Sequence, residues 1–211
     1  MLVGILALQG DVAEHASALA DLGIACRFVR RAEDLPGLDG IVLPGGESTT
    51  MSVLLGSSGL AEPLGKELDR GLPAFGTCAG MILLASSVAD GRPDQRCYGV
   101  LDVALRRNGF GRQLDSFERD LSVAVLGETP LHGVFIRAPL VERVGDGVEV
   151  LATVPRPEEA EPGQAGPGDG APVLCRQGPA LAAAFHPELT DDRRLHAYFL
   201  SMIEEARGEE N

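Results

Sequence analysis

The stretch "LPAFGTCAGMILLASSV" (residues 72–88) decides the fold, because it reads as a buried strand, a tight turn and a helix in direct succession. The helix is expected over 79–88, and Gly76 and Gly80 leave room for a sharp turn at Cys78. The G-x-C-x-G spacing is that of a nucleophile elbow, with cysteine in place of serine. A buried, inert cysteine is the competing interpretation.

The rest of the first half repeats this alternation of short apolar runs and helical patterns. Strands are expected at 2–8, 24–29, 38–46 and 72–77, and helices at 12–23, 49–55 and 60–71. Asp11 is expected to cap the first helix and Gly23 to end it. Such a pattern predicts a parallel sheet covered by helices on both faces. Because sites form at the carboxyl ends of such strands, the turns at 44–48 and 76–80 are expected to face one crevice.

The second half has strand-like segments that indicate an antiparallel or mixed extension of this sheet. They lie at 98–107, 121–127, 132–139, 148–154, 172–178 and 180–187. An amphipathic helix is expected over 191–206. The segment 155–172 is rich in Pro, Gly, Ala and Glu, so we expect a mobile surface loop there. The whole chain, 1–211, is expected to form one three-layer α/β domain.

The composition excludes several classes of function. A net charge of −13 opposes nonspecific binding to nucleic acid or to an anionic membrane. The apolar N-terminal run lacks a basic region and a cleavage site, so it reads as a buried strand of a cytoplasmic protein. The cysteines (26, 78, 97 and 175) are far apart, with no spacing typical of zinc ligands, and they predict free thiols and no metal site.

A thiol nucleophile needs a base, and among the histidines His186 is the best candidate. It ends the apolar run "ALAAAF" and precedes Pro187 and Glu188. In an extended segment residues i and i+2 project the same way, so Glu188 is expected to orient the imidazole. His15 and His196 lie in expected amphipathic helices, where surface or packing roles are typical.

The segment "LPGGESTT" (43–50) supplies a third candidate element. Two glycines after a strand let the backbone approach a ligand, and the N–H groups of Gly45 and Gly46 are candidate oxyanion donors. The N–H of Ala79, which follows the candidate nucleophile, is another. No G-K-[ST] follows, which excludes a phosphate loop, and Ser48 or Thr49 is expected to cap the next helix.

Together "PGGES", "GTCAG" and "FHPE" resemble the class I, triad-type glutamine amidotransferases, which have a flavodoxin-like fold. The stretches "GILALQGDVAEH", "RRNGFGRQLDSFE" and "GVFIRAP" resemble one subfamily closely, the glutaminase subunits of pyridoxal 5'-phosphate synthase. This resemblance implies a Cys–His–Glu triad of Cys78, His186 and Glu188. It implies glutamine contacts at Gly46, Glu47, Ser48, Arg107, Ile136 and Arg137. Gln9 matches a position near the oxyanion hole and the partner interface.

The resemblance also implies a reaction and a partner. Glutamine would be hydrolysed through a γ-glutamyl thioester, and ammonia would pass to a synthase subunit with a (β/α)8 barrel in a large hetero-oligomer. No cofactor is expected on this chain. Two alternatives stay open: a glutaminase that feeds a different synthase, and a non-catalytic protein on the same scaffold. The family usually has serine at the position of Gly109, and this glycine is expected to loosen the loop that carries Arg107.

Overall fold

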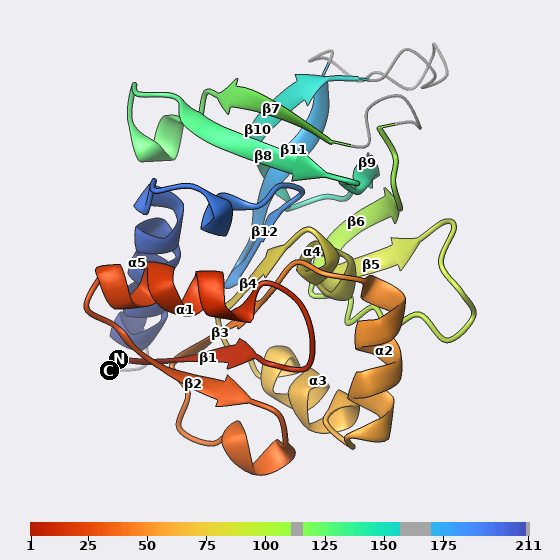
Figure 1. Ribbon diagram of the computed structural model, residues 1–211, viewed down its shortest axis with the longest axis vertical. Coiled ribbons are helices and arrows are strands. Elements are labelled where there is room, and N and C mark those ends of the chain that lie inside the picture. Colours follow the sequence, from red (N-terminus) through yellow and green to blue (C-terminus); the bar gives the residue numbers. More distant parts are fainter. Residues whose placement is uncertain (111–115, 157–169, 210–211) are drawn as a thin grey trace.

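Strand β4 (Ala74–Thr77), which leads into Cys78, lies inside the main sheet of the computed structural model (Figure 1). The structure describes residues 1–110, 116–156 and 170–209. Within these residues the main sheet is seven-stranded, in the order β10-β11-β12-β4-β3-β1-β2. The other strands of this sheet are β1 (Leu2–Leu6), β2 (Ala25–Val29), β3 (Gly40–Leu43), β10 (Glu149–Pro155), β11 (Gly170–Gln177) and β12 (Ala180–Ala183). Strands β12, β4, β3, β1 and β2 run parallel, which confirms the mostly parallel sheet.

Helices cover both faces of this sheet, as predicted. They are α1 (Val12–Asp21), α2 (Ser48–Ser57), α3 (Ala61–Asp69), α4 (Ala79–Leu84) and α5 (Arg194–Glu209). The ring of Phe75 on β4 lies 6.3 Å from the ring of His15 in α1 and 5.6 Å from that of Phe199 in α5. The next residue, Gly76, faces the other side, where it packs on Gly80 of α4. Helices α1 and α5 therefore share one face, while α4, with α2 and α3 beside it, covers the other (Figure 1).

The antiparallel extension is also confirmed. One small sheet contains β5 (Ala85–Val88), β6 (Leu101–Arg106) and β9 (Leu140–Val144), and β6 pairs antiparallel with β9. A hairpin is formed by β7 (Ser116–Leu121) and β8 (Leu131–Ile136). Short 3-10 turns complete the described elements: η1 (Ala32–Asp34), η2 (Ala124–Leu126) and η3 (Pro187–Leu189). None of the helices in the described part of the chain has the length and apolar character that a membrane crossing requires.

Several predicted elements were wrong in type or extent. The helix expected over 79–88 stops at Leu84, because 85–88 pair with β6 and Ser86 Oγ donates to the carbonyl of Val103 at 2.8 Å. In place of the strand expected at 121–127, Leu121 ends β7 and Ala124–Leu126 form the turn η2, followed by Gly127 with a φ of 95°.

Strands β7 and β9 were missed, because charged residues interrupt their apolar pattern. Of the loop expected at 155–172, residues 157–169 lie outside the described residues. Its ends at Pro155 and 170–172 belong to strands β10 and β11 instead.

The packing around Gly80 yields a stability prediction. A Cβ at Gly80 would lie 1.9 Å from the backbone oxygen of Leu43, so Gly80→Ala should cost about 2 kcal/mol or more of unfolding free energy. The matched control is Gly56→Ala in α2, where nothing lies within 4 Å and helix propensity should add about 0.5–1 kcal/mol. Chemical denaturation measures both, and a Gly80→Ala protein as stable as the wild type would contradict this packing.

Candidate active site

Cys78 sits on a strained turn between β4 and α4, as the G-x-C-x-G pattern predicts. Its φ of 48° and ψ of −102° are unusual for a residue with a side chain, and such strain persists only where the surroundings enforce it. Its N–H donates to the carbonyl of Ala183 on β12 at 2.8 Å, and its own carbonyl accepts from Met81 in the first turn of α4. Cys78 as a residue is only 7% exposed, and its thiol donates to the carbonyl of Ile136 at 3.8 Å.

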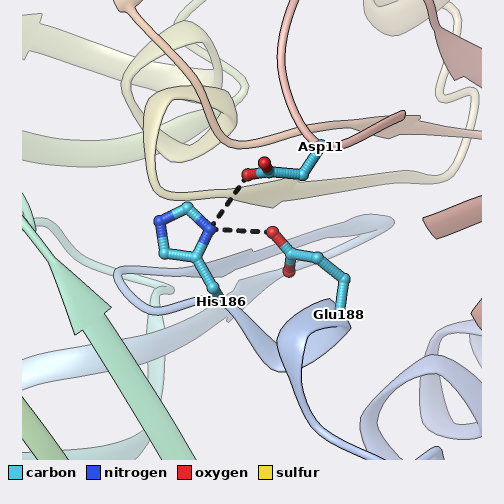
Figure 2. A group of neighbouring side chains, drawn as sticks. All are labelled: Asp11, His186 and Glu188. Carbon is cyan, nitrogen blue, oxygen red and sulfur yellow. Dashed lines mark hydrogen bonds and ion pairs between the residues drawn. The ribbon is translucent and has the colours of Figure 1, made fainter. Parts of the chain in front are cut away.

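The His186 imidazole lies between two carboxylates at the carboxyl end of β12 (Figure 2). Its Nδ1 is 2.8 Å from Glu188 Oε1 and 3.2 Å from Asp11 Oδ2. The predicted contact between His186 and Glu188 is present, but the extended geometry predicted for it was wrong. Residues 187–189 form the turn η3, since Pro187 occupies its first position and favours a helical φ.

The two carboxylates determine the protonation of this group. Burial lowers the pKa of His186, but hydrogen bonds with Asp11, Cys78 and Glu188 outweigh it and raise that pKa to about 12. The hydrogen bond with His186 lowers the pKa of Asp11, while burial raises that of Glu188. A proton on Nδ1 shared with both carboxylates thus leaves Nε2 as the nitrogen free to exchange a proton with a thiol.

The same cluster has the donor types of a cation site. One ligand atom each from Asp11, His186 and Glu188 lies within 4.8 Å of the others. A single proton on Nδ1 accounts for both short contacts without an ion, because it presents a donor to each carboxylate. We therefore interpret the cluster as the orienting part of a general base.

The glycine turn after β3 packs directly against this base. A Cβ on Gly45 would lie 2.4 Å from His186 Cε1, so only glycine allows the backbone this close. Gly46 has a φ of 151°, and the next N–H, of Glu47, donates to Gln9 Oε1 at 2.8 Å. The turns at 44–48 and 76–80, expected to face one crevice, both contribute residues to the lining of one pocket.

The cap of α2 differs from the prediction. Neither Ser48 nor Thr49 caps the helix, because the carboxylate of Glu47 accepts from the N–H groups of Thr49 (3.1 Å) and Thr50 (2.7 Å). Burial acts in the opposite direction, yet the hydrogen bonds from Thr50 and Thr49 lower the pKa of Glu47 to about 2. Glu47 therefore stays ionised near neutral pH and places a negative charge at the rim of the pocket.

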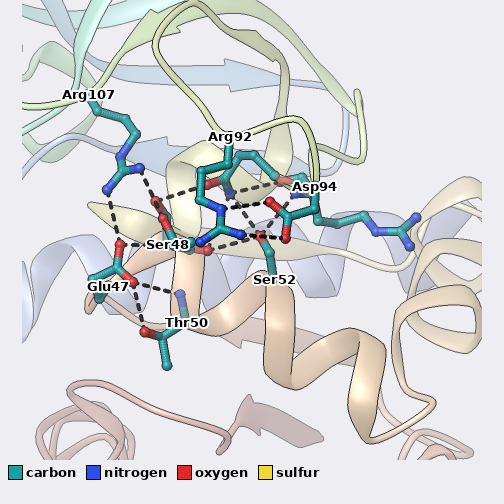
Figure 3. Close-up of polar contacts among 10 residues, drawn as sticks. Glu47, Ser48, Thr50, Ser52, Arg92, Asp94 and Arg107 are labelled. Atoms are coloured by element: carbon teal, nitrogen blue, oxygen red, sulfur yellow. Dashed lines mark hydrogen bonds and ion pairs between the residues drawn. The ribbon is translucent and has the colours of Figure 1, made fainter.

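Arg107 lies opposite this charge (Figure 3). Its guanidinium is 3.0 Å from Glu47 Oε1 and donates to Thr49 Oγ1 at 3.0 Å. Gly109, expected to loosen the loop, lies against Leu140, and its N–H donates to the carbonyl of Ala138 at 3.1 Å. The loop is therefore anchored two residues after Arg107.

Beside this pair, α2 is tied to the segment that follows β5. Gln95 Nε2 donates to Ser52 Oγ at 2.9 Å, and Ser48 Oγ donates to Gln95 Oε1 at 3.4 Å. Arg92 and Asp94 form an ion pair at 3.0 Å in the same segment (Figure 3). These contacts fix the start of α2, and with it the position of Glu47.

One pocket collects most of the predicted site residues. Those that line it are Gln9, Gly46, Glu47, Ser48, Cys78, Ala79, Arg107, Ile136, Arg137 and His186. The predicted residues Gly45 and Glu188 do not line it and instead contact His186 from behind. Sequence reasoning missed five further lining residues: Asp11, Ile82, Asn108, Pro139 and Leu189.

Asp11 is the most important of the missed residues. It stands at the N-cap position of α1, as predicted, but its side chain makes no cap hydrogen bond and turns to His186. The available signal was its place just after β1, at the same sheet edge as the other turns.

Comparison with known proteins identifies the class. The fold, with its cysteine turn at the carboxyl edge of a parallel sheet, is that of the class I glutamine amidotransferases. A solved structure described as a glutamine amidotransferase superposes with a TM-score of 0.83 at 49% identity, over 96% of this chain and 98% of the other. The PurLQS structure from Thermotoga maritima, at 17% identity and a TM-score of 0.63 over 95% and 97% of the two chains, shares the fold.

The family model described as the SNO glutamine amidotransferase family matches residues 5–205, and the chain belongs to this family. Its curated relatives include the pyridoxal 5'-phosphate synthase subunit PdxT of Salinispora tropica, 55% identical over 97% of both chains. The protein of the same description from Mycobacteroides abscessus is 54% identical over 96% of this chain and 97% of its own.

The contact with Asp11 yields a prediction about protonation. Asp11→Asn keeps an oxygen near Nδ1 but removes a negative charge, so the pKa of His186 should fall. The 15N shifts of the imidazole, recorded against pH, should show His186 losing its proton at lower pH than in the wild type. The control is Asp102→Asn, whose carboxylate pairs with Arg143 and should leave His186 unchanged. Coincident titration curves for wild type and Asp11→Asn would refute this role.

Proposed function

We propose that this chain hydrolyses L-glutamine to L-glutamate and ammonia, with Cys78 as nucleophile, His186 as general base and Glu188 as its partner. The observation that carries the proposal is the strained, pocket-facing Cys78 beside an imidazole held by the buried carboxylate of Glu188 and the half-buried one of Asp11. Membership of a glutamine amidotransferase family supports it. The whole chain would act as one amidotransferase domain.

In the first half-reaction, the thiol proton lies on His186, whose raised pKa favours the imidazolium, and the sulfur attacks the side-chain amide carbon of glutamine. The imidazolium then gives this proton to the amide nitrogen, the C–N bond breaks, and ammonia leaves. A γ-glutamyl thioester remains on Cys78. Glu188 and Asp11 stabilise the imidazolium formed in between, because both accept from its Nδ1.

In the second half-reaction, water replaces ammonia. His186 takes a proton from the water as its oxygen attacks the thioester carbon, and the C–S bond breaks to restore the thiol and release glutamate. Each tetrahedral intermediate needs donors for its oxyanion. Backbone N–H groups of Ala79 and Gly46, which line the pocket, are the proposed source, with α4 beginning at Ala79; Gly45, the third donor expected from the sequence, lies outside the lining.

The rim of the pocket carries charges that suit an α-amino acid. A glutamine zwitterion offers a carboxylate to Arg107 and Arg137 and an ammonium group to Glu47. In the structure Glu47 and Arg107 pair with each other at 3.0 Å, and the two charges of a substrate would each take one of them. Gly46, Ser48 and Ile136 would complete the glutamine contacts.

We further propose that the ammonia passes to a pyridoxal 5'-phosphate synthase subunit with a (β/α)8 barrel, in a large hetero-oligomer. The relatives named as subunits of this synthase support the assignment. Gln9 would lie near the interface. A cytoplasmic location stays a prediction.

One feature of the site supports activation by docking. The carbonyl of Ile136 faces the Cys78 thiol, and Arg137 has a φ of 45°. A carbonyl oxygen repels a developing oxyanion, so the free chain should be a slow glutaminase until the partner changes this peptide.

The test is glutamine hydrolysis titrated with the synthase subunit. Activity should rise on titration and fall by at least about a thousandfold in Cys78→Ala, as for loss of a nucleophile. The matched control is Cys97→Ser, a half-buried thiol whose pKa is raised by burial, and it should stay active. Undiminished turnover in Cys78→Ala would refute the nucleophile assignment.

A second measurement separates the alternatives. An electrophilic glutamine analogue should modify Cys78 and no other cysteine. Failure to modify it even with the synthase present would favour a non-catalytic protein. Activation only by a different synthase would favour the other glutaminase.

A further inference from the structure

A second network of buried polar side chains lies behind the His186–Glu188 pair. His15 Nε2, on α1, is 3.5 Å from Glu188 Oε2 and 3.1 Å from Thr77 Oγ1 on β4. His15 Nδ1 is 3.0 Å from His196 Nε2 on α5. The sequence left surface or packing roles open for the two histidines, and the structure buries both completely.

The atoms of this network that lack a hydrogen-bond partner determine which ring nitrogens of His15 and His196 carry the protons. Within the described residues, Glu188 Oε2 and His196 Nδ1 are buried side-chain atoms with no hydrogen-bond partner. A buried N–H without an acceptor costs more than a lone pair without a donor, so His196 carries its proton on Nε2 and donates to His15 Nδ1. His15 then carries its own proton on Nε2, which donates to Thr77 Oγ1 and lies 3.5 Å from Glu188 Oε2.

The opposite arrangement fails on the same grounds. A proton on His15 Nδ1 would force the His196 proton onto its orphaned Nδ1. It would also turn the lone pair of His15 Nε2 toward the Glu188 carboxylate, which repels it. The geometry therefore allows donation from His196 to His15 and from His15 to Thr77, with the His15 N–H beside Glu188 Oε2.

We propose that His15 is a positioning residue for Glu188: its neutral imidazole places an N–H 3.5 Å from Oε2, too far for a hydrogen bond but close enough to attract the carboxylate, so that Oε1 stays on His186. Through Thr77 the same N–H would tie this carboxylate to the residue before Cys78. The inference rests on the proposed function, because it gives His15 a purpose only where His186 acts as a base.

The charges around the network agree with a neutral His15. The titratable groups around Glu188 are His186, Asp11 and His15. Cys78 also faces His186, and Arg193 lies near His196. Burial, followed by His196 and His186, lowers the pKa of His15 well below its usual value. Burial likewise lowers the pKa of His196 to about 4. A neutral His15 presents its N–H dipole to Glu188 without competing with His186 for the charge of this carboxylate.

Two substitutions of His15 distinguish a role of its N–H in positioning Glu188 from a role of the ring in filling the core. His15→Leu fills the space but removes the donor, whereas His15→Gln places an amide N–H where Nε2 lies. In the complex with the synthase subunit, His15→Leu should lower kcat for glutamine hydrolysis roughly tenfold or more with KM unchanged, and His15→Gln should restore most of it. Equal kcat losses in the two variants would overturn the proposal.

A second readout needs no partner. The rate of alkylation of Cys78 by iodoacetamide, followed against pH in the free chain, reports the charge on the imidazole beside the sulfur. In His15→Leu the midpoint should move to higher pH, because a less supported Glu188 stabilises the imidazolium less. The control, His196→Phe, leaves the His15 N–H in place and should keep the wild-type midpoint. If the midpoint of His196→Phe shifted as far as that of His15→Leu, the proposal would be overturned.

Thr77→Val covers the case in which His15→Leu does not fold. It removes the hydrogen-bond acceptor of the His15 N–H and leaves Glu188 beside that N–H, so kcat should stay within roughly twofold of the wild type. A tenfold loss would make Thr77, and not Glu188, the partner that matters. A wild-type complex without glutaminase activity would instead refute the proposed function, which no His15 variant can do.

Discussion

The backbone of Cys78, held at a φ of 48°, is the constraint on which the site depends. Such a conformation costs of the order of 1–3 kcal/mol and must be enforced by its neighbours. Here Gly76 packs against Gly80, and Gly80 against the backbone of Leu43, so strand, turn and helix meet without side chains between them. As a result, the sulfur of Cys78 lies above the edge of the sheet, and a helix begins at the next residue.

The parallel sheet then brings the other parts to the same edge. Strands β1, β3, β4 and β12 end beside one another, and Asp11, Gly45, Cys78 and His186 follow those ends. The hydrogen bond from Asp11 N to the carbonyl of Gly45, at 3.2 Å, joins two of these turns directly. The protonation of His186 is therefore set by residues that lie far apart in sequence.

Local patterns predicted much of this arrangement. The G-x-C-x-G turn, the glycines at 45–46 and the His-Pro-Glu segment each report a neighbourhood of a few residues, and each lies where expected. Asp11 was read as a helix cap because that is what a lone Asp before a helix usually does. Its contact with His186 needs the strand order β12-β4-β3-β1, which no local pattern contains.

The remaining failures have the same origin. Residues 85–88 continue an apolar helical pattern, but pairing with β6 turns them into a strand. His15 and His196 look like ordinary helix residues, although α1 and α5 pack together over Phe75 and bury them as a hydrogen-bonded pair. Tertiary packing, and not local propensity, gives both histidines their partners.

The most direct measurement is rapid acid quenching of the chain, mixed with its synthase subunit and glutamine, followed by mass spectrometry of the peptides. A glutamyl group in thioester linkage on the peptide that contains Cys78, and absent from Glu188→Gln or much reduced there, is the expected result. Glutamate formation at the wild-type rate with Cys78 unmodified at every time point would contradict the assignment of this strained cysteine as the nucleophile.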